Sequence, residues 1–316
     1  MTTHEHSHVA RDAEVRPHGL IVMDKPPGPS GFDCIRHLRK NCNFPKKWKA
    51  GHLGTLDPFA SGVMVVALGQ AVRYTSYGLS SSKKYRARLW LGDETSTLDP
   101  TGEVIKSAPV PTDWRDRLDK VAKDLTGKYF QTPPIFSAKH IDGKRSYIAA
   151  RQGETVELEP VEVEIFSLEF GEHTDEWVDF TAHVSGGTYI RSLGRDIAIK
   201  LGTVGHLLGL ERTQAGKFPI DEAIPFRAFE VGGSGVLMHH LRKVEEILEN
   251  LKAVIVRNDF VEKIKFGKAI FENELKGEVP ESGEIRLTNS AGDFLSLGRV
   301  EKDKAGVIPF KPWISD

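Results

Sequence analysis

Residue types that could carry chemistry are densest between Gly51 and Gly62, where the sequence is GHLGTLDPFASG. Three glycines, a proline and several small residues in this stretch predict a tightly turned loop whose backbone can approach another molecule closely. The loop also holds two titratable side chains, His52 and Asp57. Because an Asp-Pro pair is common in ordinary turns, these residues alone leave Asp57 open as a turn residue or as a catalyst.

Two more side chains offer a phenol and a guanidinium. Tyr85 belongs to an alternating apolar pattern and is expected to point inward, and Arg191 lies in the opening turn of a predicted helix. A carboxylate buried beside an arginine is held as an anion, so it can act as a nucleophile or a base. Taken singly, Tyr85 also fits a core aromatic and Arg191 a structural ion pair, and the sequence does not show that they meet.

The elements that must position these side chains follow from apolar periodicity. Ser30, with Asp33 three residues later, predicts a capped helix in which Phe32, Ile35 and Leu38 recur at helical spacing. A second helix is marked by Ile190, Leu193, Ile197 and Leu201. Strands are predicted over residues 62–69, 83–91, 161–170 and 177–184. A phase slip at 165–166 indicates a bulge in the third of these strands.

Composition limits the classes of protein. The chain has 316 residues, and 43 Lys and Arg against 44 Asp and Glu give a formal net charge of -1, so there is no overall positive field for a nucleic acid. Basic residues are instead gathered locally. No acidic residue occurs between Cys34 and Leu56, and residues 128–151 hold five Lys and Arg against one acid. The second segment suggests a protruding element over a partner surface; a solvated charged insertion is the alternative.

Two cysteines, Cys34 and Cys42, support neither a zinc site nor a disulfide framework. There is no apolar signal-like segment and no stretch long enough to span a bilayer, so we expect a cytoplasmic protein. Residues 1–17 are polar and aperiodic, which predicts a disordered tail. The change to glycine-punctuated strand patterns near residue 250 predicts a domain boundary followed by a small β-rich module.

In their order along the chain, these pieces resemble one family, the TruB-type tRNA pseudouridine-55 synthases of the bacterial stand-alone branch. Together the matches cover most of residues 19–218, and the ordered set is specific although each fragment alone is modest. The matching stretches are DKPPGPSGFD at 24–33, GHLGTLDPFASGVMVVALGQAVR at 51–73, KKYRARLWLGDETSTLDPTGEV at 83–104, QTPPIFSAKHIDGKRSYIAARQG at 131–153, SGGTYIRSLGRDIAIKLG at 185–202 and HLLGLERTQAG at 206–216.

The resemblance implies an α+β fold. Its catalytic domain, with a mixed and largely antiparallel sheet, would occupy residues 18–250, with a thumb-like insertion at about 131–156 and a PUA-like RNA-binding domain at 251–316. The implied activity is isomerisation of uridine to pseudouridine at position 55 in the T loop of tRNA, by base flipping and an essential aspartate. The resemblance implies no metal and no organic cofactor, and a monomer that needs no protein partner.

Site residues also follow from the resemblance. It implies that Asp57 is the catalytic aspartate, that Arg191 pairs with it, and that Tyr85 stacks on the base or helps to move the carbon-5 proton. The implied RNA-binding residues are those of the first motif, the pocket and the thumb, namely Lys25, Pro26, His52, Tyr189, Leu210, Lys139, Lys144 and Arg145.

Two other functions are considered. One is an RNA-binding module or tRNA-folding chaperone without required catalysis, whose function would survive Asp57→Asn. The other is a guide-RNA-dependent synthase of the archaeal and eukaryotic branch, which the thumb-like insertion and the lack of long basic extensions argue against. Catalysis and chaperone activity can coexist, because a synthase that opens the tRNA elbow can also help it refold.

Overall fold

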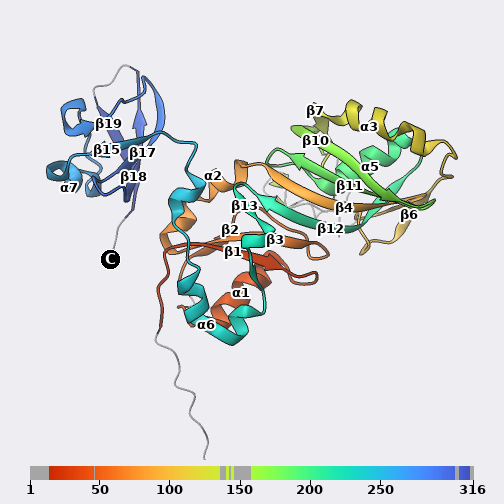
Figure 1. The fold of residues 1–316 in the computed structure, drawn as a ribbon, viewed down its shortest axis with the longest axis horizontal. Coiled ribbons are helices and arrows are strands. Elements are labelled where there is room, and N and C mark those ends of the chain that lie inside the picture. Colours follow the sequence, from red (N-terminus) through yellow and green to blue (C-terminus); the bar gives the residue numbers. More distant parts are fainter. Residues whose placement is uncertain are drawn as a thin grey trace, which may run out of the picture.

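The computed structural model describes residues 14–45, 47–135, 140–141, 144–145, 158–302 and 306–313. A large mixed sheet with helices packed on it forms most of the elongated molecule, and a smaller sheet lies at one end (Figure 1). This arrangement of helices and largely antiparallel strands confirms the predicted α+β class. No helix within the described ranges is long and apolar enough to cross a membrane.

The large sheet has ten strands. Eight form its main path, in the spatial order β14 (Ile224–Pro225), β1 (Gly19–Lys25), β3 (Ser61–Leu68), β12 (Gly205–Ala215), β4 (Lys83–Leu91), β11 (Trp177–Val184), β10 (Val161–His173) and β7 (Gly127–Gln131). At its sides, β2 (Ala50–His52) pairs with β3, and β13 (Phe218–Pro219) pairs with β12. The pairs β1–β14 and β3–β12 are parallel, and the other pairs are antiparallel.

The burial of the strands explains their sequence patterns. From Gly62 to Leu68 every residue of β3 is buried, because Val63 and Val65 face one apolar cluster while Met64 and Val66 face another. Strand β4 alternates buried and more exposed residues as predicted. The predicted bulge in β10 is confirmed by a register shift between Ile165 and Ser167 against β11.

Helices pack on the large sheet in two groups. α3 (Leu118–Leu125) and α5 (Ile190–Leu201) cover strands β4, β10 and β11 with a shared apolar core (Figure 1). α1 (Gly31–Asn41) and α6 (Ala228–His239) pack together beside β1 and β3. The remaining helical turns of this part are η1 (Gly69–Tyr74), α2 (Thr75–Ser80), η2 (Trp114–Arg117), η3 (Ile220–Glu222) and η4 (Val244–Ile247).

Helix α1 begins as the sequence predicts. The Ser30 hydroxyl accepts a hydrogen bond from the Asp33 amide at 3.2 Å, and the Asp33 carboxylate accepts one from the Ser30 amide at 3.0 Å. Ile35 and Leu38 are buried, but Phe32 is 64% exposed, so the predicted apolar stripe does not include it. Cys34 fills the buried face instead.

The smaller sheet has five strands in the order β16 (Leu275–Lys276), β15 (Ala253–Val256), β17 (Gly283–Thr288), β18 (Phe294–Val300) and β19 (Val307–Pro312). Its helical turns are η5 (Asn258–Phe260), α7 (Val261–Lys265) and η6 (Glu272–Glu274). An apolar cluster of its own includes Val256, Ile264 and Leu287. The assignment of 251–316 as a PUA-like domain stays a prediction.

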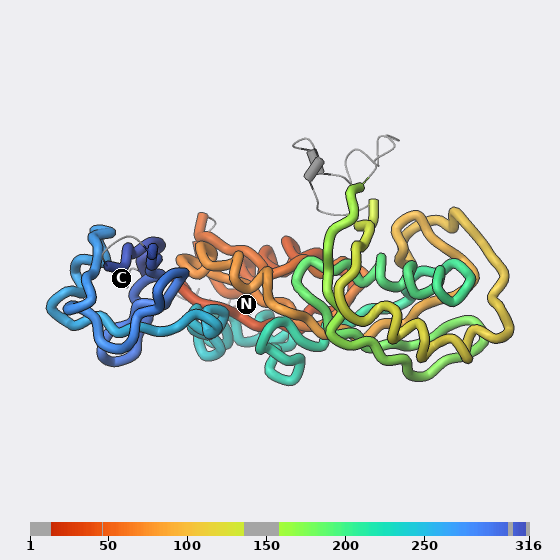
Figure 2. Tube along the Cα trace, turned by 90° about the horizontal axis from the view of Figure 1, so that it is seen from above, coloured from red at the N-terminus to blue at the C-terminus, as the bar shows by residue number. Residues whose placement is uncertain are grey.

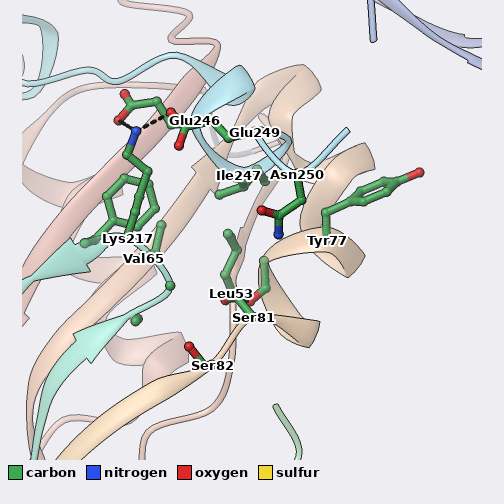
Figure 3. Close-up of a pocket in the computed structure, with 14 residues that line it drawn as sticks. Leu53, Val65, Tyr77, Ser81, Ser82, Lys217, Glu246, Ile247, Glu249 and Asn250 are labelled. Carbon is green, nitrogen blue, oxygen red and sulfur yellow. Dashed lines mark hydrogen bonds and ion pairs between the residues drawn. The ribbon is translucent and has the colours of Figure 1, made fainter. Parts of the chain in front are cut away.

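The two sheets are joined by η1 and α2. The Tyr74 hydroxyl donates to the Lys311 carbonyl at 2.5 Å, and the Tyr77 hydroxyl donates to Glu284 at 2.5 Å. A cavity of about 260 Å³ lies beside α2, where Lys217 forms ion pairs with Glu246 and Glu249 (Figure 3). This cavity is lined by none of the predicted site residues.

Two shorter hairpins complete the described structure. β5 (Asp93–Thr95) pairs with β6 (Val104–Ser107), and β8 (His140–Ile141) pairs with β9 (Lys144–Arg145). Strands β7 and β10 run side by side (Figure 2), and the segment that contains β8 and β9 comes between them in the sequence. The rest of this segment, including Lys139, lies outside the described residues, as do the side chains of Lys144 and Arg145.

The predicted tail of residues 1–17 needs a correction at its end. The Val15 amide donates to the Asn43 carbonyl at 3.3 Å, and the Trp48 indole donates to the Pro17 carbonyl at 2.8 Å. Residues 14–17 therefore pack on the region after α1, because the Val15 side chain joins an apolar cluster with Trp48 and the Pro17 carbonyl accepts the Trp48 hydrogen bond. Residues 1–13 lie outside the described ranges.

Candidate active site

Asp57 and Arg191 form a two-bond ion pair. Asp57 lies in the loop between β2 and β3, and Arg191 lies in the first turn of α5. The Arg191 Nε donates to Asp57 Oδ2 at 2.9 Å, and its Nη2 donates to Oδ1 at 3.2 Å. The arginine side chain is 7% exposed while that of the aspartate is 30% exposed, so a fixed guanidinium presents a carboxylate to solvent.

A second carboxylate holds the other edge of the same guanidinium. Arg191 Nη1 donates to the Thr97 carbonyl at 2.8 Å and lies 3.5 Å from Asp99 Oδ2. Asp99 is buried and accepts hydrogen bonds from the hydroxyls of Thr97 and Thr101 at 2.7 and 2.5 Å. Sequence reasoning missed Asp99, since its flanking threonines and following proline signal only a turn.

A cavity of about 720 Å³ opens at this pair. Five of the predicted residues line it together, namely Asp57, Tyr85, Tyr189, Arg191 and Leu210. Tyr85 on β4 and Leu210 on the neighbouring β12 are buried side chains, and they supply an aromatic and an aliphatic surface. The cavity therefore combines a charged end with apolar walls, which suits a flat heterocycle with polar edges.

Two buried cations that the sequence did not single out also line the cavity. The Lys83 ammonium donates to the carbonyls of Leu79 at 2.7 Å and Ser81 at 2.5 Å, and Arg212 donates to those of Val63 and Gly54 at 2.6 and 3.3 Å. Burial, with a smaller effect of Arg212, lowers the pKa of Lys83 to about 8. In the sequence Lys83 shares the inward phase of Tyr85 on this strand, but its charge and the neighbouring Lys84 hide the burial that the alternation implies.

Lys25 is placed differently from the prediction. It is fully buried, and its ammonium donates to the carbonyls of Pro26 at 2.9 Å, Pro29 at 3.0 Å and Pro58 at 3.3 Å. Burial lowers its pKa. Lys25 therefore does not contact RNA in this conformation, because its ammonium is buried and donates to carbonyls of two loops. It fastens the loop before α1 to the residue that follows Asp57, and Pro26 lies on that fastened loop, outside the cavity lining.

His52 lies on β2, close to the cavity but not among its lining residues. Its Nδ1 is buried and has no hydrogen-bond partner within the described part of the chain. The exposed ring of Phe32 meets it edge-on at 6.1 Å, and a Cβ at Gly31 would lie only 2.9 Å from the imidazole. Burial, followed by the charge of Arg212, lowers the pKa of His52, so the imidazole is neutral at neutral pH.

Comparison with solved structures identifies the fold. The chain is similar to a protein in the structure of an H/ACA ribonucleoprotein bound to a substrate RNA containing 2′-deoxyuridine, with a TM-score of 0.69, 24% identity, and coverage of 94% of this chain and 85% of that one. It is similarly related to a chain of a Cbf5-Nop10-Gar1 complex, with a TM-score of 0.68, 25% identity, and coverage of 93% and 84%. The first of these likenesses concerns the fold alone.

Sequence comparison defines the class more narrowly. The model of the TruB family pseudouridylate synthase N-terminal domain matches residues 39–190, which include Asp57 and Tyr85. The tRNA pseudouridine synthase B of Caldanaerobacter subterraneus subsp. tengcongensis is 33% identical, over 90% of this chain and 96% of that protein. The enzyme of the same name from Bacillus subtilis is 33% identical, over 92% and 95%. The chain belongs to the TruB family of pseudouridine synthases, as its sequence pattern predicts.

Proposed function

We propose that this protein isomerises uridine to pseudouridine at position 55 in the T loop of tRNA, with Asp57 as the essential residue. The observation that carries the proposal is the Asp57–Arg191 pair at a cavity walled by Tyr85 and Leu210. The relatives named tRNA pseudouridine synthase B support the choice of substrate.

The reaction makes clear demands on such a site. The bond between N1 and the sugar C1′ breaks, the freed base turns, and a bond between C5 and C1′ forms while a proton leaves C5 and N1 gains one. Nothing is oxidised or reduced, so the balance requires no redox cofactor. A base in a stacked loop must first be flipped out, and a cavity with an aromatic and an aliphatic wall can hold it.

The residues around the cavity suit these demands. Asp57 is the nucleophile or the electrostatic partner of the reacting nucleotide, and Arg191 fixes the direction of its two oxygens. The Tyr85 ring is placed to stack on the base or to help transfer the C5 proton. Lys83 and Arg212 add buried positive charge near the position where an anionic RNA strand must approach.

The binding proposal extends beyond the cavity. We propose that Tyr189 and the insertion residues Lys139, Lys144 and Arg145 bind the T-arm stem-loop, with residues 251–316 as a PUA-like RNA-binding domain. Structured RNA is recognised through loops, stacking and phosphates, so a protein of near-zero net charge can bind it through local basic segments. We further propose that the protein acts in the cytoplasm as a monomer without a protein partner.

The test is a pseudouridine assay on a T-arm stem-loop transcript. Wild type is expected to form product with or without chelator, and Asp57→Asn is expected to lower the rate at least about 1000-fold while RNA binding persists. Asp113→Asn is the matched control, because Asp113 forms an exposed ion pair with Arg117. Product from Asp57→Asn at the wild-type rate would refute the catalytic assignment, and RNA binding by an inactive wild type would favour a chaperone or another RNA.

A further inference from the structure

Gln131 is a fully buried polar side chain at the end of β7, next to the candidate active site. Its Oε1 accepts a hydrogen bond from the Tyr189 amide at 2.9 Å, and its Nε2 donates to the Tyr189 carbonyl at 3.2 Å and to the Tyr129 hydroxyl at 2.8 Å. Burial of an amide is costly unless its polar atoms are satisfied. Here one side chain satisfies both backbone groups of a single residue.

The orientation of this amide is fixed by its partners. The Tyr189 N–H can only donate, so the atom that faces it must be the amide oxygen, and the Tyr189 carbonyl can only accept, so the atom that faces it must be the nitrogen. The two hydrogen bonds therefore resemble the pairing of one residue in a β-ladder, with the Gln131 amide in place of a backbone peptide group. They fix both the position and the rotation of Tyr189.

Tyr189 is the N-cap of α5, and its own side chain makes no capping hydrogen bond. Its carbonyl also accepts the first helical bond, from the Leu193 amide at 3.0 Å. Gln131 consequently supports the start of a helix that lacks an ordinary side-chain cap. Arg191 lies two residues later in the same turn, and its guanidinium donates hydrogen bonds to both carboxylate oxygens of Asp57.

We propose that Gln131 is a positioning residue for the proposed reaction: its amide sets the first turn of α5 so that Arg191 aligns Asp57. The inference rests on the proposed function and adds a residue that contacts neither the base nor Asp57. Misplacement of a reacting group by about 1 Å can cost about 100-fold in rate, so a support of this kind is felt in the chemical step.

Other hydrogen bonds near this pairing provide controls. The Ser192 hydroxyl of α5 donates to the carbonyl of Thr132, the residue after β7, at 2.8 Å. The Tyr129 hydroxyl donates to Asp196 at 3.3 Å, and Tyr129→Phe removes the third bond of Gln131 while it leaves the Tyr189 pairing intact. If Gln131 only stabilised the fold, substitutions at Gln131, Ser192 and Tyr129 would have the same effect on kcat.

The experiment compares Gln131→Met, Gln131→Glu, Ser192→Ala and Tyr129→Phe with wild type on the T-arm transcript, at a temperature where each is fully folded. Gln131→Met is expected to lower kcat about 10- to 100-fold with KM and RNA affinity within about threefold of wild type. Gln131→Glu keeps the acceptor for the Tyr189 amide and should give an intermediate kcat, while the two control variants stay within about threefold.

The outcomes separate the two proposals. An active wild type with an unchanged kcat in both Gln131 variants, or with a loss confined to KM, overturns the positioning role and leaves the proposed function standing. Equal losses in Ser192→Ala and Gln131→Met also overturn it. A wild type that forms no product on the T-arm transcript overturns the proposed function and the positioning role together. If Gln131→Met fails to fold, the Gln131→Glu variant decides the question.

Discussion

Buried cations surround the loop that carries Asp57. Lys25, Lys83 and Arg212 each donate to backbone carbonyls, whereas Arg191 meets the carboxylates of Asp57 and Asp99. Carbonyl dipoles satisfy the donors but do not cancel the positive charges, so a positive potential persists around this loop. That potential favours an approaching phosphate, and the charge of Arg212 disfavours a second proton on His52.

The buried imidazole of His52 makes stability depend on pH. Its folded-state pKa is lowered from 6.5 by burial and by Arg212, so the unfolded chain binds a proton at a higher pH than the folded chain does. The contribution of neutral His52 to the free energy of unfolding should therefore be complete above about pH 6.5, the unfolded pKa. It should be lost as the pH falls from there toward the lower folded pKa. Urea unfolding at about pH 7 and about pH 5 should show a smaller loss for His52→Gln than for wild type. Parallel pH dependence in the two proteins would contradict this.

Helix α2 reaches both the small sheet and the cavity at Asp57. The Tyr77 hydroxyl on α2 donates to Glu284 on β17, while Leu79 near the end of α2 lines this cavity of about 720 Å³. Lys83 holds that end by donating to the carbonyls of Gly78 and Leu79 in the last turn and of Ser81 just after it. The Gly78 carbonyl also accepts a hydrogen bond from the Ser81 hydroxyl at 2.7 Å. A Cβ at Gly78 would lie 2.2 Å from Leu53, so the helix also packs closely on the residue that follows β2.

Removal of the Lys83 ammonium tests this arrangement. Lys83→Met leaves several carbonyls without their donor, and we expect the free energy of unfolding to fall by about 1–3 kcal/mol. Lys84→Met is the matched control, since the neighbouring lysine is exposed on the same strand, and we expect a change below about 0.5 kcal/mol. Equal effects in urea unfolding would show that the buried ammonium contributes no more than a surface lysine.

Sequence reasoning succeeds here where a pattern is local. The alternation of β4, the capping box of α1 and the bulge of β10 depend on neighbouring residues, and all three are found. The proposed catalytic residues Asp57, Tyr85 and Arg191 are predicted only from the resemblance, because Asp57 and Arg191 meet only through the fold. Asp99 and Gln131 were missed for the same reason: each acts through partners far along the chain or through backbone atoms that no side-chain pattern reveals.

The whole molecule is held together by an apolar cluster shared between the two sheets. Phe294 and Leu297 of β18 belong to the same apolar cluster as Val63 and Val65 of β3, and the Phe294 ring meets that of Tyr74 in η1 at 5.5 Å. A contact between sheets that is buried and apolar couples their unfolding, in contrast to the more polar interfaces that let domains move independently. We therefore expect one cooperative thermal transition for the full chain.

Phe294 decides whether the shared cluster produces this cooperativity. It is 4% exposed, so Phe294→Ala should lower the free energy of unfolding by about 3–5 kcal/mol and broaden or split the calorimetric transition. Phe266→Ala is the control within the same small module, because Phe266 is 73% exposed and its loss should leave the transition unchanged. Two well-separated transitions in the wild type would show that the sheets unfold independently, and the cluster would then be a contact surface between two units rather than a shared core.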